Sequence, residues 1–195
     1  MYQNIKNYIS SLDFSLEGSR KHILNELASY ILQNENPKLN FICTHNSRRS
    51  HLSQVWAQVF AHYFGIEAAT YSGGTEATAF HPNAVAALRR AGLEITDGEG
   101  INPKYTVEFA EGVKPMICFS KTFDDAINPQ KDFAAVMTCS EADSDCPFVH
   151  GASKRIKLFY EDPKVSDGTS DELKTYDKRC AQIASEMKYV FSLIK

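Results

Sequence analysis

The chain has 195 residues and a mass of 21.9 kDa, which is the size of one domain with a short extension. Its apolar fraction of 43% and charged fraction of 23% are typical of a globular protein and exclude a disordered or fibrous chain. The 21 Lys and Arg residues against 24 Asp and Glu residues give a net charge of −3. This balance disfavours binding to nucleic acid or to an anionic membrane.

The sequence contains no apolar run near the roughly 20 residues that a membrane helix needs, and its N-terminus lacks the features of a secretion signal. We therefore expect a cytoplasmic protein with no membrane partner. The five cysteines are an odd number in a chain large enough to fold without disulfides. This argues against a structural disulfide framework.

The first half of the chain predicts alternating helices and strands. Residues 1–36 read as helical, with apolar residues at three- and four-residue spacing. Residues 39–43 form a short apolar strand, and a polar turn leads into a helix over about residues 50–64. A second strand over 67–72 ends at two glycines, and the next helix begins at Pro82 and ends at Gly92.

The second half begins with an irregular stretch over residues 102–130, in which 105–109 and 116–119 are predicted to pair as an inserted hairpin. Residues 133–139 are apolar throughout, as a parallel strand buried on both faces should be. Residues 155–160 read as a fourth strand, followed by a long helix. The apolar stripe of that helix consists of Leu173, Tyr176, Cys180, Ile183, Met187, Val190 and Ile194.

This alternation predicts an α/β protein, a three-layer α/β/α fold around a four-stranded parallel sheet. We place the domain at residues 37–195, with residues 1–36 as an N-terminal helical extension. The extension could cover the helices of the sheet or bind a second subunit.

A short segment between the first strand and the following helix carries the strongest chemical signal. It reads Cys43-Thr44-His45-Asn46-Ser47-Arg48-Arg49-Ser50. At such a position, backbone N–H groups can point inward around an oxyanion, and the helix dipole adds positive potential. The same field favours thiolate over thiol, so Cys43 is predicted to be nucleophilic at neutral pH. Arg49 can grip two oxygens of the anion, and Ser50 can hydrogen-bond to the thiolate.

The pattern C-T-x-N-S-x-R-S resembles the phosphate-binding loop of the low-molecular-weight protein tyrosine phosphatases and of the thioredoxin-coupled arsenate reductases, which share one fold. The likeness continues through residues 71–76 and 80–85 and spans about residues 39–194. It implies a low-molecular-weight phosphatase-like fold and a site for an arsenate or phosphate oxyanion. The substrate-binding residues would be Thr44, His45, Asn46, Ser47, Arg48 and Ser50.

A second motif places Cys139 and Cys146 in a polar segment directly after the third core strand. The ends of parallel strands meet at one sheet edge, so Cys139 could approach Cys43. The C-x6-C spacing suits zinc poorly, because paired zinc ligands are usually two to four residues apart. Two inert loop cysteines remain an alternative. If the two thiols exchange with Cys43, we expect the six residues between them to form a flexible hydrophilic span that can rearrange.

The segment is similar to the redox loop of the thioredoxin-coupled arsenate reductases. That resemblance implies that Cys43 attacks arsenate, that Cys139 then attacks the Cys43 sulfur and that Cys146 displaces Cys43 by thiol–disulfide exchange. Thioredoxin would be the external reductant, and no cofactor would be bound. Asp162, in the turn after the fourth strand, matches the general acid of both groups, with Glu161 as a fallback.

Three positions depart from the family pattern. His45 stands where the loop usually has Gly. Either a residue other than Gly can adopt the backbone conformation of that position, or the site is altered. Arg48 replaces a small residue or Cys, and we expect its charge to strengthen anion capture. Gln54 replaces a Glu tied to a monovalent cation in many such reductases, so we predict no cation dependence.

The remaining cysteines and histidines receive a structural interpretation. Cys118 and Cys180 lie in apolar patterns and are predicted to pack in the core. Four histidines show no metal-ligand spacing and are interpreted as surface or structural residues. They are His51, His62, His81 and His150.

Two alternatives to arsenate reduction stay open. One is a protein tyrosine phosphatase that works through a Cys43 phosphocysteine and in which Cys139 and Cys146 protect the nucleophile reversibly. Its activity under reducing conditions should survive the loss of Cys139 and Cys146. No tyrosine follows Asp162-Pro163, where phosphatases often place aromatic residues. The other is a non-catalytic anion-binding module, suggested by His45 and disfavoured by the intact set of Cys43, Arg49 and Asp162.

Overall fold

The computed structural model describes residues 1–12, 16, 18–146 and 148–195. Its first half contains α1 (Gln3–Ser11), α2 (Gly18–Gln33), β1 (Lys38–Cys43), α3 (Arg49–Phe64), β2 (Ala69–Gly74), α4 (Pro82–Arg90) and β3 (Glu94–Thr96). Its second half contains β4 (Tyr105–Glu108), β5 (Met116–Cys118), β6 (Phe133–Met137), α5 (Ser140–Asp145), β7 (Ala152–Lys157), a 3₁₀ turn η1 (Pro163–Ser166) and α6 (Glu172–Ser192).

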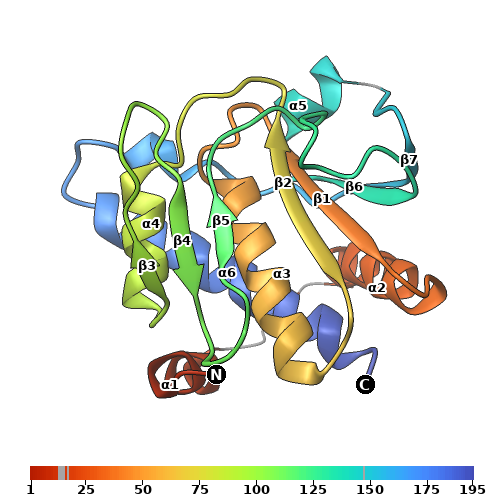
Figure 1. Cartoon of the computed structure of the whole chain (residues 1–195), viewed down its shortest axis with the longest axis horizontal. Helices are drawn as coiled ribbons and strands as arrows, with labels where there is room; N and C mark the ends of the chain where they lie inside the picture. Colours follow the sequence, from red (N-terminus) through yellow and green to blue (C-terminus); the bar gives the residue numbers. More distant parts are fainter. Residues whose placement is uncertain (13–15, 17, 147) are drawn as a thin grey trace.

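The main sheet has four parallel strands in the order β2-β1-β6-β7, so the predicted parallel sheet flanked by helices is confirmed. Parallel strands all end at the same edge, and the segments that leave β1, β6 and β7 therefore begin side by side. Figure 1 shows β1 and β2 pointing toward the end of the molecule at which α5 lies.

The two faces of the main sheet carry cores of different size. Leu39, Phe41 and Val136 face the larger core, into which α3 and α6 pack. Ile42 and Met137, one residue out of phase, face a smaller core shared with Ala142 of α5. Because Cys43 and Cys139 both belong to the smaller core, the sheet brings the two thiols to the same face.

The inserted hairpin is present, and it belongs to a second sheet. β4 and β5 pair antiparallel as expected, and the unpredicted strand β3 pairs along the other side of β4, giving the order β3-β4-β5. β3 has only three residues and none of them is buried, so its sequence offers no alternating pattern to detect.

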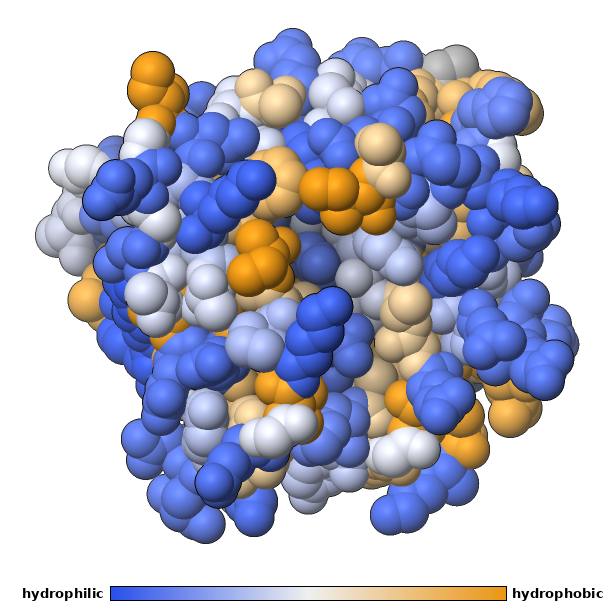
Figure 2. Space-filling view, viewed as in Figure 1, coloured by the Kyte–Doolittle hydropathy of each residue, from blue (hydrophilic) through white to orange (hydrophobic). Residues whose placement is uncertain are grey.

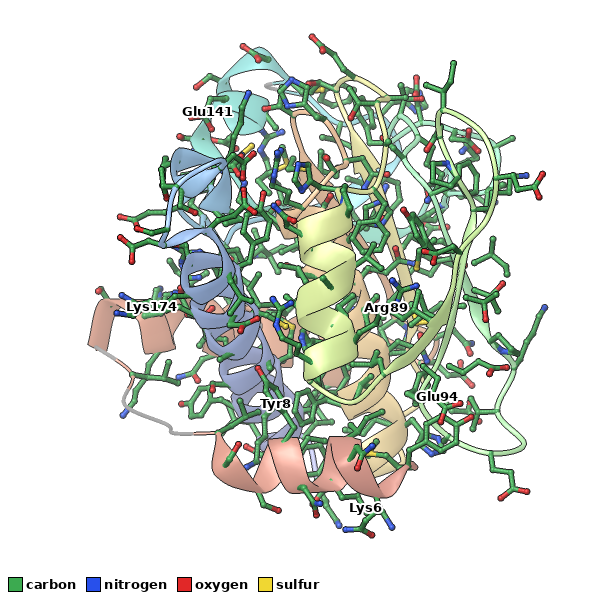
Figure 3. The ribbon with its side chains drawn as sticks, turned by 90° about the vertical axis from the view of Figure 1, so that its left-hand side faces the viewer. Lys6, Tyr8, Arg89, Glu94, Glu141 and Lys174 are labelled. Carbon is green, nitrogen blue, oxygen red and sulfur yellow. The ribbon has the colours of Figure 1, made fainter. Side chains whose placement is uncertain are left out.

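The N-terminal helices join the larger core. Ile5 and Ile9 of α1 and Leu24 and Leu27 of α2 are at most 1% exposed and cluster with the residues of the main domain. Figure 3 shows α1 lying across the lower ends of α4 and α6, with Tyr8 directed toward the helices and Lys6 directed away. The extension therefore packs against the helices, and the domain boundary near residue 36 stays a prediction.

Several boundaries differ from the sequence prediction. β2 extends through the two glycines, which pair with Ile42 and Cys43 of β1. The backbones approach closely there: a Cβ on Gly74 would lie 2.6 Å from the Thr44 carbonyl oxygen. β7 begins and ends three residues earlier than expected, and residues 158–160 continue as an irregular segment whose amides bond back to Met137 and Thr138. Leu173 is 58% exposed, not buried, because it lies in the first turn of α6.

Two further observations concern the surface. None of the helices in the described part of the chain combines the length and apolarity that a bilayer crossing requires. The face drawn in Figure 2 is mainly hydrophilic, with apolar side chains in small separate groups.

Candidate active site at the ends of β1, β6 and β7

The loop between β1 and α3 holds Cys43 at its base. Cys43 is 3% exposed, and its Sγ lies 3.1 Å from the Ser50 hydroxyl in the first turn of α3. The side-chain amide of Asn46 donates a hydrogen bond of 2.9 Å from its Nδ2 to the same hydroxyl. Ser50 therefore connects the thiol to the loop that surrounds it, as the sequence predicts for this residue.

Asn46 is the residue with left-handed backbone in this loop, at φ 43°. Asn tolerates this conformation better than most residues, because its short polar side chain can bond locally. Its Oδ1 accepts a hydrogen bond of 2.9 Å from the backbone N–H of Lys121. His45 does not have a positive φ, so the loop needs no glycine at the position where the family pattern has one.

The backbone N–H groups of the loop are available to a ligand. Within the described part of the chain, the backbone N–H groups of residues 44–48 donate to no protein acceptor. Arg48, the residue before α3, provides no side-chain cap for the helix, although the first N–H groups of a helix usually find a partner. These free amides and the positive end of α3 together form a site suited to a tetrahedral oxyanion.

Other polar groups of the loop are engaged outside this ring of amides. The Ser47 hydroxyl donates to the Ala79 carbonyl at 2.7 Å. The His45 carbonyl accepts from the hydroxyls of Ser120 and Thr78 at 2.9 and 3.1 Å. The His45 imidazole is about half exposed and lies 3.8 Å from Glu76. These contacts hold the loop from outside and leave its backbone amides for the anion.

Arg49 is buried between the loop and the segment that follows β7. Its guanidinium donates to the Tyr160 carbonyl at 3.0 Å and to the Asp162 carboxylate at 2.7 Å. Its Nε–H is buried and has no partner among the described residues. A buried charged donor without a partner is energetically costly, and a bound oxyanion would satisfy it.

Asp162 lies at the start of η1, directly beside the loop. One carboxylate oxygen bonds to Arg49, and the other accepts from the Lys164 backbone N–H at 3.0 Å. Glu161 points elsewhere: its side chain is 92% exposed and pairs with Arg179 at 3.1 Å. The geometry therefore favours Asp162 over Glu161 as the acid. A cleft of about 650 Å³ opens here, between Arg49, Glu141, Phe159 and Val165.

Arg48 differs from its expected role. Its guanidinium bonds to the Asp167 carboxylate at 2.8 Å and to the Tyr176 hydroxyl at 2.6 Å. The side chain is thus held by η1 and α6, and its charge is paired with Asp167. The expectation that this charge strengthens anion capture is not supported by this arrangement.

The second cysteine reaches the loop from β6. The Cys139 Sγ lies 3.5 Å from the hydroxyl of Thr44, the residue next to Cys43 and 95 positions earlier in the chain. Cys139 also caps α5, where its sulfur accepts the Ala142 N–H at 3.4 Å. Burial raises the pKa of the Cys139 thiol, opposed by the hydrogen bonds from Thr44 and Ala142 and by the charge of Arg49.

The segment between the two redox-motif cysteines is helical, which corrects the expectation of a flexible loop. α5 runs from Ser140 to Asp145, with Cys139 and Cys146 as its caps. Seven residue steps at 1.5 Å per residue separate the caps by about 10 Å. A disulfide needs Cα atoms within about 7 Å of each other, so Cys139 and Cys146 cannot bond while α5 is folded.

An arginine on β7 holds this helix. Arg155 donates to the Asp143 carboxylate at 2.6 and 2.9 Å, to the Asp143 carbonyl at 2.8 Å and to the Cys146 carbonyl at 2.7 Å. Lys157 also pairs with Asp143, at 3.0 Å. Burial raises the pKa of Cys146, and Arg155 opposes this. Residue Pro147, which completes the motif, lies outside the described residues.

The other cysteines pack in the core, as predicted. Cys118 and Cys180 are 0% exposed, and burial raises the pKa of each thiol to about 12. The Trp56 indole donates to Cys180 at 3.2 Å. Among the residues described, no three or more His, Cys, Asp or Glu side chains are placed to hold a metal ion. Gln54 bonds to the Thr70 carbonyl at 3.2 Å.

The histidines have structural surroundings. His51 is buried against the Phe80 ring and lies 3.2 Å from the Ser72 hydroxyl. His81 caps α4. His62 packs edge-on against Phe109, and His150 is exposed.

The sequence reading missed Ser120, Lys121, Tyr160 and Arg155 as supports of the site. Ser120, Lys121 and Tyr160 act through a backbone group or a short hydroxyl, so their residue types do not indicate that they support the site. Arg155 did have a sequence signal: the basic residues of the predicted fourth strand are complementary in charge to the acidic residues between the two cysteines.

Comparisons with known proteins found curated relatives of the chain and solved structures of the same fold. No family model matches the chain. It is 30% identical over 139 residues to an arsenate reductase of Bacillus licheniformis, covering 71% of this chain and 83% of that protein. It is 29% identical over 145 residues to an arsenate reductase of Bacillus subtilis, covering 74% and 87%.

Solved structures show the same fold. A low-molecular-weight phosphotyrosine phosphatase from Vibrio cholerae superimposes with a TM-score of 0.53 at 14% identity, covering 80% of this chain and 94% of that one. An arsenate reductase from Archaeoglobus fulgidus superimposes with a TM-score of 0.50 at 19% identity, covering 79% and 98%.

Proposed function

The chain belongs to the arsenate reductase family, and we propose that it reduces arsenate to arsenite through Cys43, Cys139 and Cys146. The observation that carries this proposal is the position of Cys139. Its sulfur lies at the Thr44 hydroxyl, on the edge of the loop that contains Cys43, on the same face of the sheet. Hydrolysis of a phosphate ester through Cys43 requires no second thiol, whereas the reduction of arsenate does.

The first step is attack on the oxyanion. The amides of residues 44–48 and the Nε–H of Arg49 bind the arsenate oxygens. The Cys43 thiolate attacks arsenic and forms a sulfur–arsenic bond, and the hydroxyl of arsenate leaves as water after it takes the proton of Asp162. Ser50 donates a hydrogen bond to the thiolate before the attack.

The second step transfers two electrons. The Cys139 thiolate attacks the Cys43 sulfur, a disulfide forms, and the electron pair of the sulfur–arsenic bond stays on arsenic. Arsenic is thereby reduced from As(V) to As(III) and leaves as arsenite, while the two sulfurs are oxidised. The hydrogen bonds to the Cys139 sulfur from Thr44 and Ala142 favour its thiolate form.

The third step moves the disulfide to the surface. The Cys146 thiolate attacks the Cys139 sulfur and releases the Cys43 thiolate. Because the two ends of α5 are too far apart for a disulfide, this step requires α5 to unwind and the contacts of Arg155 to break. The open segment presents the disulfide to an external dithiol, for which we propose thioredoxin, and no cofactor needs to be bound.

The test is arsenate-dependent NADPH consumption with thioredoxin and thioredoxin reductase. We expect turnover in the parent and none in Cys43→Ser, Cys139→Ser or Cys146→Ser. Cys118→Ser is the matched control, because this thiol packs in the larger core, whereas Cys43 and Cys139 belong to the smaller one, and it should keep turnover. A parent without turnover, or a Cys139→Ser variant that turns over normally, would contradict the proposal.

One observation favours phosphomonoester hydrolysis as a second activity. Cys43, Arg49 and Asp162 form a complete set for a phosphocysteine mechanism, and the cleft beside them has room for an organic leaving group. We expect slow hydrolysis of an aryl phosphate that needs Cys43 and survives in Cys139→Ser under reducing conditions. If the protein hydrolyses the aryl phosphate but does not reduce arsenate, the phosphatase interpretation is correct. If it does neither, the anion-binding module is the remaining interpretation.

A further inference from the structure

A cluster of four side chains joins the anion loop to η1, α4 and α6. Arg48 of the loop bonds to Asp167 at 2.8 Å and to the Tyr176 hydroxyl at 2.6 Å. The Tyr176 hydroxyl donates in turn to the other Asp167 oxygen at 2.7 Å. The His81 ring stacks on Tyr176, with its Nδ1 3.3 Å from the hydroxyl. Tyr176 is 0% exposed, so the cluster has a fixed base.

The cluster sits at one end of the turn that carries the acid. Asp162 and Asp167 immediately precede and follow η1 (Pro163–Ser166). The adjacent residues Arg49 and Arg48 pair with them at 2.7 and 2.8 Å. Two neighbouring arginines of the anion loop therefore hold the two ends of one short turn.

The two ion pairs differ in what happens when substrate binds. Arg49 faces the anion loop with a buried unpartnered Nε–H, so its charge is shared between Asp162 and a bound oxyanion. The guanidinium of Arg48 bonds to Asp167 and Tyr176 and is not expected to bind the oxyanion. During the reaction the Arg48 cluster is thus the fixed end of the turn.

We propose that Arg48, Asp167 and Tyr176 are positioning residues that hold the η1 turn so that Asp162 can deliver its proton to the departing oxygen. The proposal rests on the proposed function, since it needs Asp162 to act as the acid. Misplacing a proton donor by about 1 Å lowers the rate about 100-fold. Substrate affinity should change little, because the amides and Arg49 still bind the oxyanion.

The experiment compares Arg48→Ala and Asp167→Asn with the parent in the thioredoxin-coupled arsenate assay. We expect kcat to fall by about ten-fold or more and KM to stay within about two-fold. Arg48→Lys, which keeps the charge beside Asp167, should recover part of kcat. If Arg48→Ala does not fold, Arg48→Lys is compared with the parent in its place.

The matched controls are Arg90→Ala and Asp177→Asn. This Arg–Asp pair also joins α4 to α6, with contacts of 2.6 to 3.1 Å, and lies one residue from Tyr176 without touching η1. Both controls should keep kcat within about two-fold, since exposed pairs contribute little.

A double variant separates positioning from general damage. If Arg48 acts through Asp162, Arg48→Ala should have no further effect on kcat in an Asp162→Asn background. The inference would be overturned if the kcat losses of Arg48→Ala and Asp162→Asn multiplied in the double variant. It would also be overturned if Arg48→Ala left kcat unchanged or lowered it only as much as Arg90→Ala does. A parent without arsenate turnover would instead overturn the proposed function on which it rests.

Discussion

Replacing Arg155 by Met should make the disulfide between Cys139 and Cys146 easier to form. Arg155 is 23% exposed and contacts both the Asp143 carboxylate, which is 13% exposed, and the carbonyl of Cys146. These contacts exist only while α5 is folded, and the disulfide requires α5 to open. Arg155 therefore stabilises the reduced form alone, and Met keeps most of its apolar stem without the hydrogen bonds.

The size of the effect follows from the contacts that are lost. Hydrogen bonds to charged groups contribute about 1.5–3 kcal/mol each, but both partners are partly exposed and Lys157 still pairs with Asp143. We expect a net loss of about 1.5 kcal/mol from the reduced form. For a two-electron couple, 1.4 kcal/mol corresponds to about 30 mV. The reduction potential of the pair should therefore become about 30 mV more negative.

The potential is measured in a Cys43→Ser background, so that only Cys139 and Cys146 exchange. The protein is equilibrated with mixtures of reduced and oxidised dithiothreitol, and the remaining thiols are alkylated and counted by mass spectrometry. Lys154→Met is the control, because Lys154 lies on the same strand but pairs with Glu26 of α2 at 2.6 Å. An unchanged or more positive potential in Arg155→Met would show that α5 keeps these contacts in the disulfide form.

Three further predictions follow from burial. Arg20→Met removes the partner of Glu186, whose side chain is 2% exposed, and should lower the free energy of unfolding by about 3 kcal/mol in urea titrations; a change below about 0.5 kcal/mol would contradict it. Ile5→Ala should lower it by about 2–4 kcal/mol in a single transition, whereas two transitions would indicate that α1 and α2 unfold separately. Because burial raises the pKa of Cys139 above its usual value of 9.0, its thiolate fraction rises with pH up to that pKa. In a Cys146→Ser background, which stops after the second step, disulfide formation by quenched flow should accelerate steadily from pH 7 to 9, and a flat profile would contradict it.

The local geometry of the anion loop could be predicted from eight consecutive residues. A strand that ends at Cys43 and a helix that begins at Arg49 place the amides between them at a helix N-terminus, whatever the rest of the chain does. The Ser50 hydroxyl lies beside the thiol as predicted, whereas the left-handed residue is Asn46 and not His45, where the family pattern has Gly. These are short-range properties, set by backbone sterics and by hydrogen bonds within one turn.

The meeting of Cys139 with this loop was predictable at the level of topology. Parallel strands end at one edge, and the apolar run before Cys139 marks a central strand. The state of the following segment was not predictable in this way. The six residues between the cysteines, five polar residues and one alanine, carry no periodic pattern that separates a loop from a short helix, and contacts from Arg155 on another strand accompany the helix.

Arg48 shows most clearly where sequence reasoning ends. Its position in the loop, next to Arg49, was evident from the sequence, and its charge suggested a role toward the anion. Its actual partners, Asp167 and Tyr176, are 119 and 128 residues away and come from η1 and α6. A long flexible side chain can reach several partners of similar energy, so its direction depends on which groups the folded chain places around it.

The sequence by itself therefore determined the type of fold, the anion loop and the placement of Cys43 and Cys139 at the ends of two core strands, because periodicity, turn chemistry and motif spacing act over a few residues. Only the tertiary structure decided that Asp162 and not Glu161 faces Arg49, that α5 separates Cys139 from Cys146 and that Arg48 pairs with Asp167 at the end of η1. Each of these depends on contacts between segments far apart in the chain, and such contacts exist only after the sheet has assembled.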